Sequence, residues 1–194
     1  MKRIFGLLAF ALVAVLALSA CGSASSTGSS SSAADVNDAD VTFVQSMIPH
    51  HTQAVTMAKM AASHASSPAV KELATKIEAA QGPEIDIMTG WLKAWGKGSA
   101  AGSNGMDGVG GMTHGSSAMP GMMGDDQLKS LDAANGAAFD QMFLTMMMAH
   151  HQGAIEMAKT QQAEGRNADA VTLAKKIEAD QSAELAQMRD MLKS

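Results

Sequence analysis

Tyrosine is absent from this 194-residue sequence, and aromatic residues make up only 4% of it. Cys21 is the single cysteine, so neither a disulfide framework nor a thiolate metal site can form within the chain. Large aliphatic residues are also scarce, because residues 21–194 contain 8 Leu against 16 Met and 31 Ala. Either methionine fills a core built around alanine, or it is present for its sulfur.

The first 20 residues have the pattern of a secretory signal peptide. Lys2 and Arg3 precede an apolar run, residues 4–18, that is too short to span a bilayer comfortably. The sequence Leu-Ser-Ala-Cys ending at Cys21 resembles a bacterial lipobox, although an ordinary cleavage site beside a chance cysteine is the alternative. We therefore predict a lipid anchor on Cys21, a flexible Ser/Gly-rich tether over residues 21–38, and a location on the extracytoplasmic face of the bacterial cell membrane.

The charge balance is acidic. Without Lys2 and Arg3, 12 basic residues face 19 acidic ones, which gives a net charge of −7. This balance argues against a nucleic-acid partner. The sequence also shows no phosphate-binding loop and no nucleophile paired with a base, so we predict a binding function without catalysis.

Two parts of the chain, residues 39–96 and 139–194, align without a gap at an offset of 100 positions. Each part has the periodicity of a helical hairpin, and residues 97–124 between them are rich in Gly and Met. The sequence therefore predicts an all-α protein over residues 39–194. Its expected architecture is a ferritin-like four-helix bundle of two duplicated helical hairpins joined by a long Gly/Met-rich crossover loop.

Local signals set the expected helix ends. Asp38 or Asp40 can cap the first helix, and Ser67 followed by Pro68 can start the second. Pro49 and Pro83 lie inside the helical pattern, which continues on both sides of each, so we expect kinks there rather than helix ends.

Methionines and adjacent histidine pairs share one face of the first helix of each hairpin, within an arc of about 120°. A Met stripe alone is more often packing than a ligand set, but a histidine pair on the same face favours a metal site. The candidate metal ligands are Met47, His50, His51, Met57, Met147, His150, His151 and Met157.

Polar residues interrupt the apolar stripe of the second helix in each hairpin, and buried polar groups need partners. The candidates for supporting or alternative ligands are Gln81, Glu84, Met88, Gln181, Glu184 and Met188. We expect two His, two Met and one Glu of the same hairpin to supply each other's partners.

The crossover loop carries further sulfur among its glycines, where helix packing does not explain it, although low-complexity drift is an alternative. Its candidate auxiliary ligands are Met106, Met112, His114, Met119, Met122 and Met123.

The ligand types favour copper. Di-iron bundles carry Glu three residues before a ligating His, whereas this chain carries Met47 and Met147 there. Thioether with imidazole suits Cu(I), and imidazole with carboxylate or water suits Cu(II). We predict copper as the bound metal, with Cu(I) favoured and Cu(II) possible.

The segment 43–51, FVQSMIPHH, and the segment 147–158, MMAHHQGAIEMA, resemble the signature of domain-of-unknown-function family 305, which includes CopM-type periplasmic copper-binding proteins. The resemblance covers residues 39–194. It implies a helical bundle outside the cytoplasm that binds copper through the eight Met and His ligands named above.

The resulting prediction is an extracytoplasmic copper-binding protein that buffers, stores or hands on copper, with copper ions, the membrane and a copper-transfer protein as partners. Two alternatives stay open. One is a copper-dependent metallo-oxidase, and the other is a metal-free helical lipoprotein that docks a protein partner.

Overall fold

The computed structural model describes residues 35–98 and 119–193. The predicted signal peptide, the lipidation site Cys21 and the loop residues Met106, Met112 and His114 lie outside the described residues.

Helices account for nearly all of the described chain. Their bounds are α1 (Asp38–His64), α2 (Pro68–Ala94), α3 (Asp125–Ala133), α4 (Gly136–Glu164) and α5 (Ala168–Met191). The four long helices form the predicted bundle of two hairpins, so the predicted all-α fold class is confirmed. The short helix α3 was not predicted.

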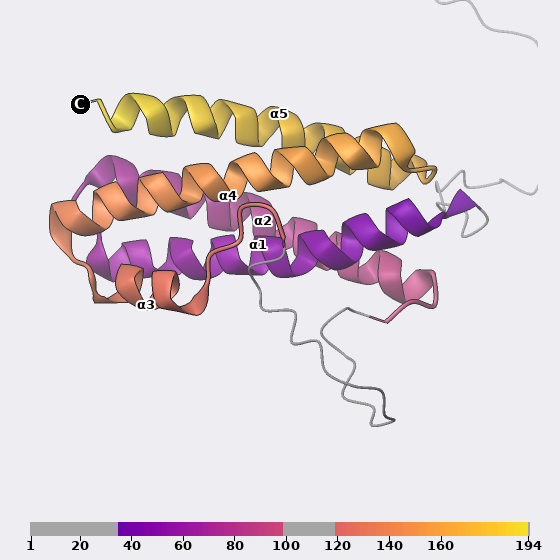
Figure 1. The fold of residues 1–194 in the computed structure, drawn as a ribbon, viewed down its shortest axis with the longest axis horizontal. Coiled ribbons are helices and arrows are strands. Elements are labelled where there is room, and N and C mark those ends of the chain that lie inside the picture. The colour runs from indigo at the N-terminus through magenta and orange to yellow at the C-terminus, as the bar shows by residue number, and fades with distance from the viewer. Residues whose placement is uncertain (1–34, 99–118, 194) are drawn as a thin grey trace, which may run out of the picture. The chain divides into compact units, whose positions relative to one another are not determined.

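The two hairpins meet through their first helices. Helix α1 packs on α2 and α4 packs on α5, while α1 and α4 form the main contact between the hairpins (Figure 1). Ala65 at the end of α1 pairs with Gly136 at the start of α4, and Asn37 before α1 donates to the carbonyl of Glu164. These contacts show that α1 and α4 run antiparallel.

Capping explains where the helices begin. Asn37, rather than Asp38 or Asp40, is the N-cap of α1, because its side chain accepts from the Asp40 N–H while the Asp40 carboxylate accepts from the Asn37 N–H. Ser67 and Pro68 start α2 as predicted. Both α1 and α2 continue past their internal prolines.

Two equivalent aspartates tie each hairpin to the other. The buried Asp40 carboxylate accepts from the backbone N–H groups of Arg166 and Asn167 in the α4–α5 connection. Its counterpart Asp140 accepts from the N–H groups of Ser66 and Ser67 in the α1–α2 connection. Each hairpin therefore holds the connection of the other by equivalent hydrogen bonds, one set at each end of the α1–α4 contact.

The core forms two apolar clusters that lie toward opposite ends of the bundle. The first contains Met57, Met147 and Met188, and the second contains Met47 and Met88. Alanines of α1 or α4 pack beside these methionines in both clusters. The core is thus built from Ala and Met, as the composition predicts.

The end of the crossover loop lies against the bundle. Residues 119–124 pass across α1 and α4 before α3 begins (Figure 1). Gln53 pairs with both the N–H and the carbonyl of Met123. Gly121 adopts a positive φ of 77° and lies close to the carbonyls of Ala149 and His150. This segment, residues 119–124, is called the loop strap below.

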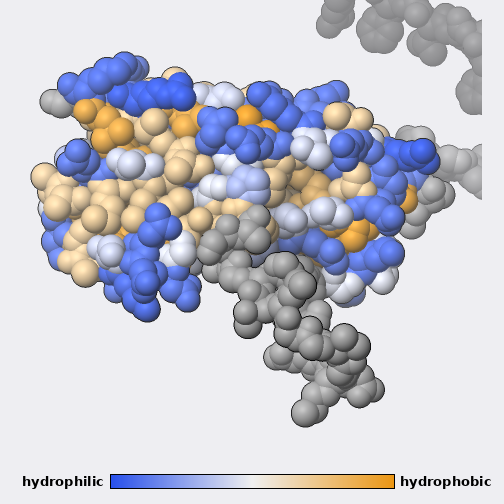
Figure 2. Space-filling view, in the orientation of Figure 1, coloured by the Kyte–Doolittle hydropathy of each residue, from blue (hydrophilic) through white to orange (hydrophobic). Residues whose placement is uncertain are grey.

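Several alanines are exposed, among them Ala137 and Ala138, and the nearby Met142 and Met146 are partly buried. Figure 2 shows weakly hydrophobic side chains over much of the visible face near α3 and α4, bordered by hydrophilic residues. None of the helices described is long and apolar enough to cross a membrane.

Candidate metal centre

His50 and His150 meet at the middle of the α1–α4 contact. Their ring centroids are 3.7 Å apart and the rings are tilted by 39°. Both residues are fully buried. Because they occupy equivalent positions in the two hairpins, they mark the centre of the duplicated bundle.

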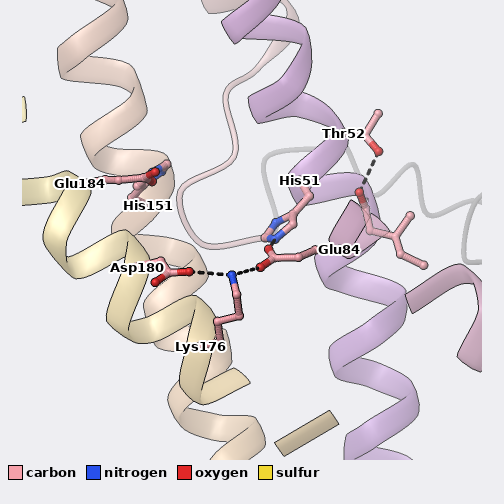
Figure 3. A network of polar contacts seen from close by, with 8 residues as sticks. His51, Thr52, Glu84, His151, Lys176, Asp180 and Glu184 are labelled. Atoms are coloured by element: carbon pink, nitrogen blue, oxygen red, sulfur yellow. Dashed lines mark hydrogen bonds and ion pairs between the residues drawn. The ribbon is translucent and has the colours of Figure 1, made fainter. Parts of the chain in front are cut away.

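His51 and His151, also fully buried, each contact a glutamate on the second helix of their own hairpin. The distance from His51 Nε2 to Glu84 Oε2 is 2.9 Å, and that from His151 Nε2 to Glu184 Oε2 is 2.6 Å. Figure 3 shows both pairs. Since a carboxylate accepts hydrogen bonds, Nε2 of each ring carries the proton, and Nδ1 keeps its lone pair.

The loop strap fixes a third ring. His50 Nε2 lies 3.0 Å from the carbonyl oxygen of Pro120. A carbonyl only accepts, so this ring nitrogen is the donor and Nδ1 is again the nitrogen with a free lone pair. His50, His51 and His151 therefore share one tautomer.

This central layer concentrates polar atoms that lack a hydrogen-bond partner within the protein. Nine such buried side-chain nitrogens and oxygens occur in the described residues, and eight belong to the four histidines, Gln81 and Gln181. Both ring nitrogens of His150 are among them. Buried polar groups are normally paired, so an unpartnered set of this kind indicates a place for a ligand.

Burial keeps the rings of His50, His51 and His150 neutral. It lowers the pKa of His50 to about 3, lowers the pKa of His51, and, together with the neighbouring imidazoles, lowers the pKa of His150 well below its usual value. The nearby His50 backbone acts to raise the pKa of His150, but burial and the neighbouring imidazoles have the larger effect. No hydrogen bond of normal geometry forms between the His50 backbone and the His150 ring. Neutral imidazoles are the form that binds metals.

One glutamate of the layer belongs to a larger charged network. Lys176 Nζ lies 3.0 Å from Glu84 Oε1 and 2.7 Å from Asp180 Oδ2 (Figure 3). Burial acts to raise the pKa of Glu84, but the hydrogen bonds from His51 and Lys176 together lower it. The bonds to Asp180 and Glu84 raise the pKa of Lys176.

The methionines are arranged differently from the expectation of one site per hairpin. Met47 shares its apolar cluster with Met157 of the other hairpin, and Met57 shares its cluster with Met147. Antiparallel packing of α1 on α4 causes this exchange, since the start of one helix lies beside the end of the other. The histidine layer therefore lies between two methionine groups, each drawn from both hairpins.

The candidate methionines differ in exposure. Met47, Met57, Met147, Met88 and Met188 are fully buried. Met157 is partly buried and lines a surface groove between α1 and α4. In the loop strap, Met123 is buried, whereas Met119 and Met122 are partly buried. The contact between Pro120 and His50 places this end of the loop near His50.

Carboxylates and imidazoles alone do not form a preorganised metal site. Within residues 35–98 and 119–193, no three His, Cys, Asp or Glu side chains are grouped as metal ligands. A metal in this layer would therefore need thioethers or a small shift of the rings, which fits soft Cu(I) better than a hard cation.

Residues beyond the predicted set shape the site. Gly153 admits the loop strap, because a Cβ there would overlap the Pro120 backbone, and Gln53 holds Met123. These two residues occupy equivalent positions of the duplication. Their difference in the alignment is a sequence signal that something packs asymmetrically on the two hairpins.

Fold and site together define a duplicated helical-bundle protein with a buried imidazole layer between methionine groups. The family model described as domain of unknown function DUF305 matches residues 40–192. The chain belongs to this family. The comparison with curated proteins gave no match.

Solved structures agree with the family. A DUF305 protein of Streptomyces coelicolor, described as secreted, is 29% identical with a TM-score of 0.69, covering 80% of this chain and 92% of that one. CopM in the Cu(II)-bound form is 32% identical with a TM-score of 0.64, covering 79% and 95%. CopM in the Cu(I)-bound form is 31% identical with a TM-score of 0.63, covering 79% and 95%.

Proposed function

We propose that this protein binds copper outside the cytoplasm and buffers it, stores it or hands it on to a partner protein. The observation that carries the proposal is the buried layer of imidazole nitrogens without partners in the protein, placed between two groups of methionines. The similarity to CopM, which has been solved in Cu(I)-bound and Cu(II)-bound forms, supports the choice of metal.

The proposed ligands combine the rings with the nearest sulfurs. The set is Met47, His50, His51, Met57, Met147, His150, His151 and Met157. Glu84 and Glu184 orient two of the rings, and a hydrogen-bonded carboxylate also strengthens the imidazole as a ligand. Cu(I) is favoured because thioethers need no deprotonation and burial keeps the rings of His50 and His51 neutral.

A titration tests the proposal. The soluble form lacking residues 1–21 keeps every residue of the described bundle and can be titrated with Cu(I), Cu(II), Zn²⁺ and Fe²⁺ against competing chelators. We expect Cu(I) to bind most tightly. H150A should weaken it, whereas H64A should not, because His64 lies outside the layer and contacts the carbonyl of Ala134. A folded protein that binds no Cu(I) would contradict the proposal and favour the docking alternative.

Two further measurements address the remaining assignments. Catalytic oxidation of Cu(I) to Cu(II) with many turnovers per protein would favour the metallo-oxidase alternative over a buffer. The proposed lipid anchor predicts that the full-length protein fractionates with membranes and that C21A releases it. The anchor would be contradicted if the full-length protein and C21A both stayed with the membranes, or if both appeared in the soluble fraction.

A further inference from the structure

The two His–Glu pairs are equivalent in the duplication but differ in their surroundings. Both oxygens of Glu84 are engaged, one by His51 at 2.9 Å and the other by Lys176 at 3.0 Å. Glu184 contacts His151 through one oxygen at 2.6 Å, and no donor among the described residues contacts the other. The Glu184 side chain is also the more exposed, at 19% against 8%.

This difference originates in one lysine. Lys176 extends from α5 to α2, and Asp180 one turn further along α5 holds it at 2.7 Å (Figure 3). The equivalent Lys76 instead pairs with Glu72 of its own helix, and the position equivalent to Asp180 is an alanine. The charge on Glu84 is therefore compensated, while that on Glu184 is not.

Compensation of the carboxylate changes what its histidine can bind. A carboxylate hydrogen-bonded to Nε2 increases the electron density at Nδ1 and offsets the charge of a metal bound there. Lys176 cancels much of this effect at His51 and also repels an incoming cation. Both contributions grow with the charge of the metal, so they affect a divalent ion more than Cu(I).

We propose that His151 with Glu184 is the stronger site for a divalent cation such as Cu(II), and that Lys176 weakens the equivalent site at His51 with Glu84. This assignment rests on the proposed copper-binding function. Lys176 acts through Glu84 and is a residue that sets specificity without touching the metal.

The test is a Cu(II) titration of the soluble form followed by electron paramagnetic resonance. All forms carry H114A, which removes the histidine of the crossover loop. With Lys176 present we expect two unequal binding steps. K176M should strengthen the weaker step roughly tenfold and leave the stronger one unchanged. E184Q should weaken the stronger step and change its spectrum.

Matched variants separate charge from structure. K176R keeps the positive charge and should keep the two steps unequal, while K76M removes an equally placed lysine and should change neither step. Cu(I) affinity should change by less than Cu(II) affinity in K176L, which removes the charge without adding a thioether. Equal Cu(II) binding steps before any substitution, or unchanged steps in K176M, would overturn the assignment while leaving the proposed function intact. A protein that binds neither copper ion would overturn the proposed function and this assignment with it.

Discussion

Each central histidine is buried away from water and has an Nδ1 atom without a hydrogen-bond partner in the protein. The rings of His50 and His51 lose water on folding and donate only one hydrogen bond each, from Nε2. The Nδ1 atoms have no partner in the protein, which is a cost to stability that a bound metal would offset. At the residue scale, the unpartnered nitrogens of the proposed metal site therefore lower the stability of the metal-free fold.

The metal-free protein should lose stability as the pH falls below about 6.5. The folded-state pKa values of His50, His51 and His150 are lowered, so the unfolded chain binds more protons below about pH 6.5, and for His50 this window extends down to about pH 3. Each fully shifted ring contributes up to about 1.4 kcal/mol per pH unit within that window. Denaturant unfolding at pH 7.5, 6 and 5 measures the slope, and H150N should reduce it. A flat profile would show that the rings are not held neutral.

Sulfur and bulk can be separated at the buried methionines. Replacing Met47 and Met147 together by leucine conserves volume and should cost less than about 1.5 kcal/mol of stability per site. If both thioethers are ligands, Cu(I) affinity should fall at least tenfold, or by about 1.4 kcal/mol. M60L is the control, because Met60 packs on the core outside the proposed ligand set. Equal Cu(I) affinity in the double variant and the control would identify Met47 and Met147 as packing groups.

At the scale of elements, the loop strap distinguishes the two hairpins. Its Pro120 carbonyl accepts a hydrogen bond from His50, and it makes no such bond with the His150 ring. Gln53 binds the strap at Met123, and Gly153 leaves room for it. These contacts connect the Gly/Met-rich crossover loop to the central layer.

Gly153 and Gly90 are both helix-interior glycines with opposite expected responses to alanine. G153A should displace the loop strap, with a cost of about 1–3 kcal/mol and loss of the His50–Pro120 hydrogen bond. G90A meets no atom within 4 Å and should stabilise α2 by roughly 0.5–1 kcal/mol. Thermal unfolding compares the two. Stabilisation by G153A would mean that the strap does not lie on α4.

The sequence predicts the long helices well because their signals are local. Apolar periodicity and the Ser67–Pro68 pair locate them, and their continuation past Pro49 and Pro83 follows from the unbroken pattern. The short helix α3 has only two leucines, of which Leu131 alone is buried, so periodicity had too few points to reveal it. The loop strap was not predictable, since its partners are distant in sequence.

At the scale of the whole molecule, duplication creates contacts that run across the two copies. Asp40 and Asp140 each cap the connection of the opposite hairpin, and the methionines group across hairpins in the same way. A helical wheel identifies the inward face of α1 but not which residues of α4 meet it. This explains why the inward placement of the histidines and methionines was predictable and the grouping of the methionines was not.

Removal of the Asp40 carboxylate should destabilise the junction of the hairpins. Asp40 is fully buried and accepts from three backbone N–H groups and from the Gln161 side chain, so D40A leaves several buried donors unpaired. We expect a loss of about 3 kcal/mol or more in the free energy of unfolding. D38A, at an exposed carboxylate in the same helical turn, should cost less than about 1 kcal/mol. Similar losses in both variants would contradict a specific role for Asp40.

Anomalous diffraction at the copper absorption edge, from crystals of the Cu(I)-loaded soluble form, locates the bound copper directly. We expect a copper peak in the layer between α1 and α4, at roughly 2 Å from a ring nitrogen of His50, His51, His150 or His151. We also expect a methionine sulfur among the ligands of that copper. Copper found only on the surface or in the crossover loop, with the four rings unchanged, would contradict the proposed site.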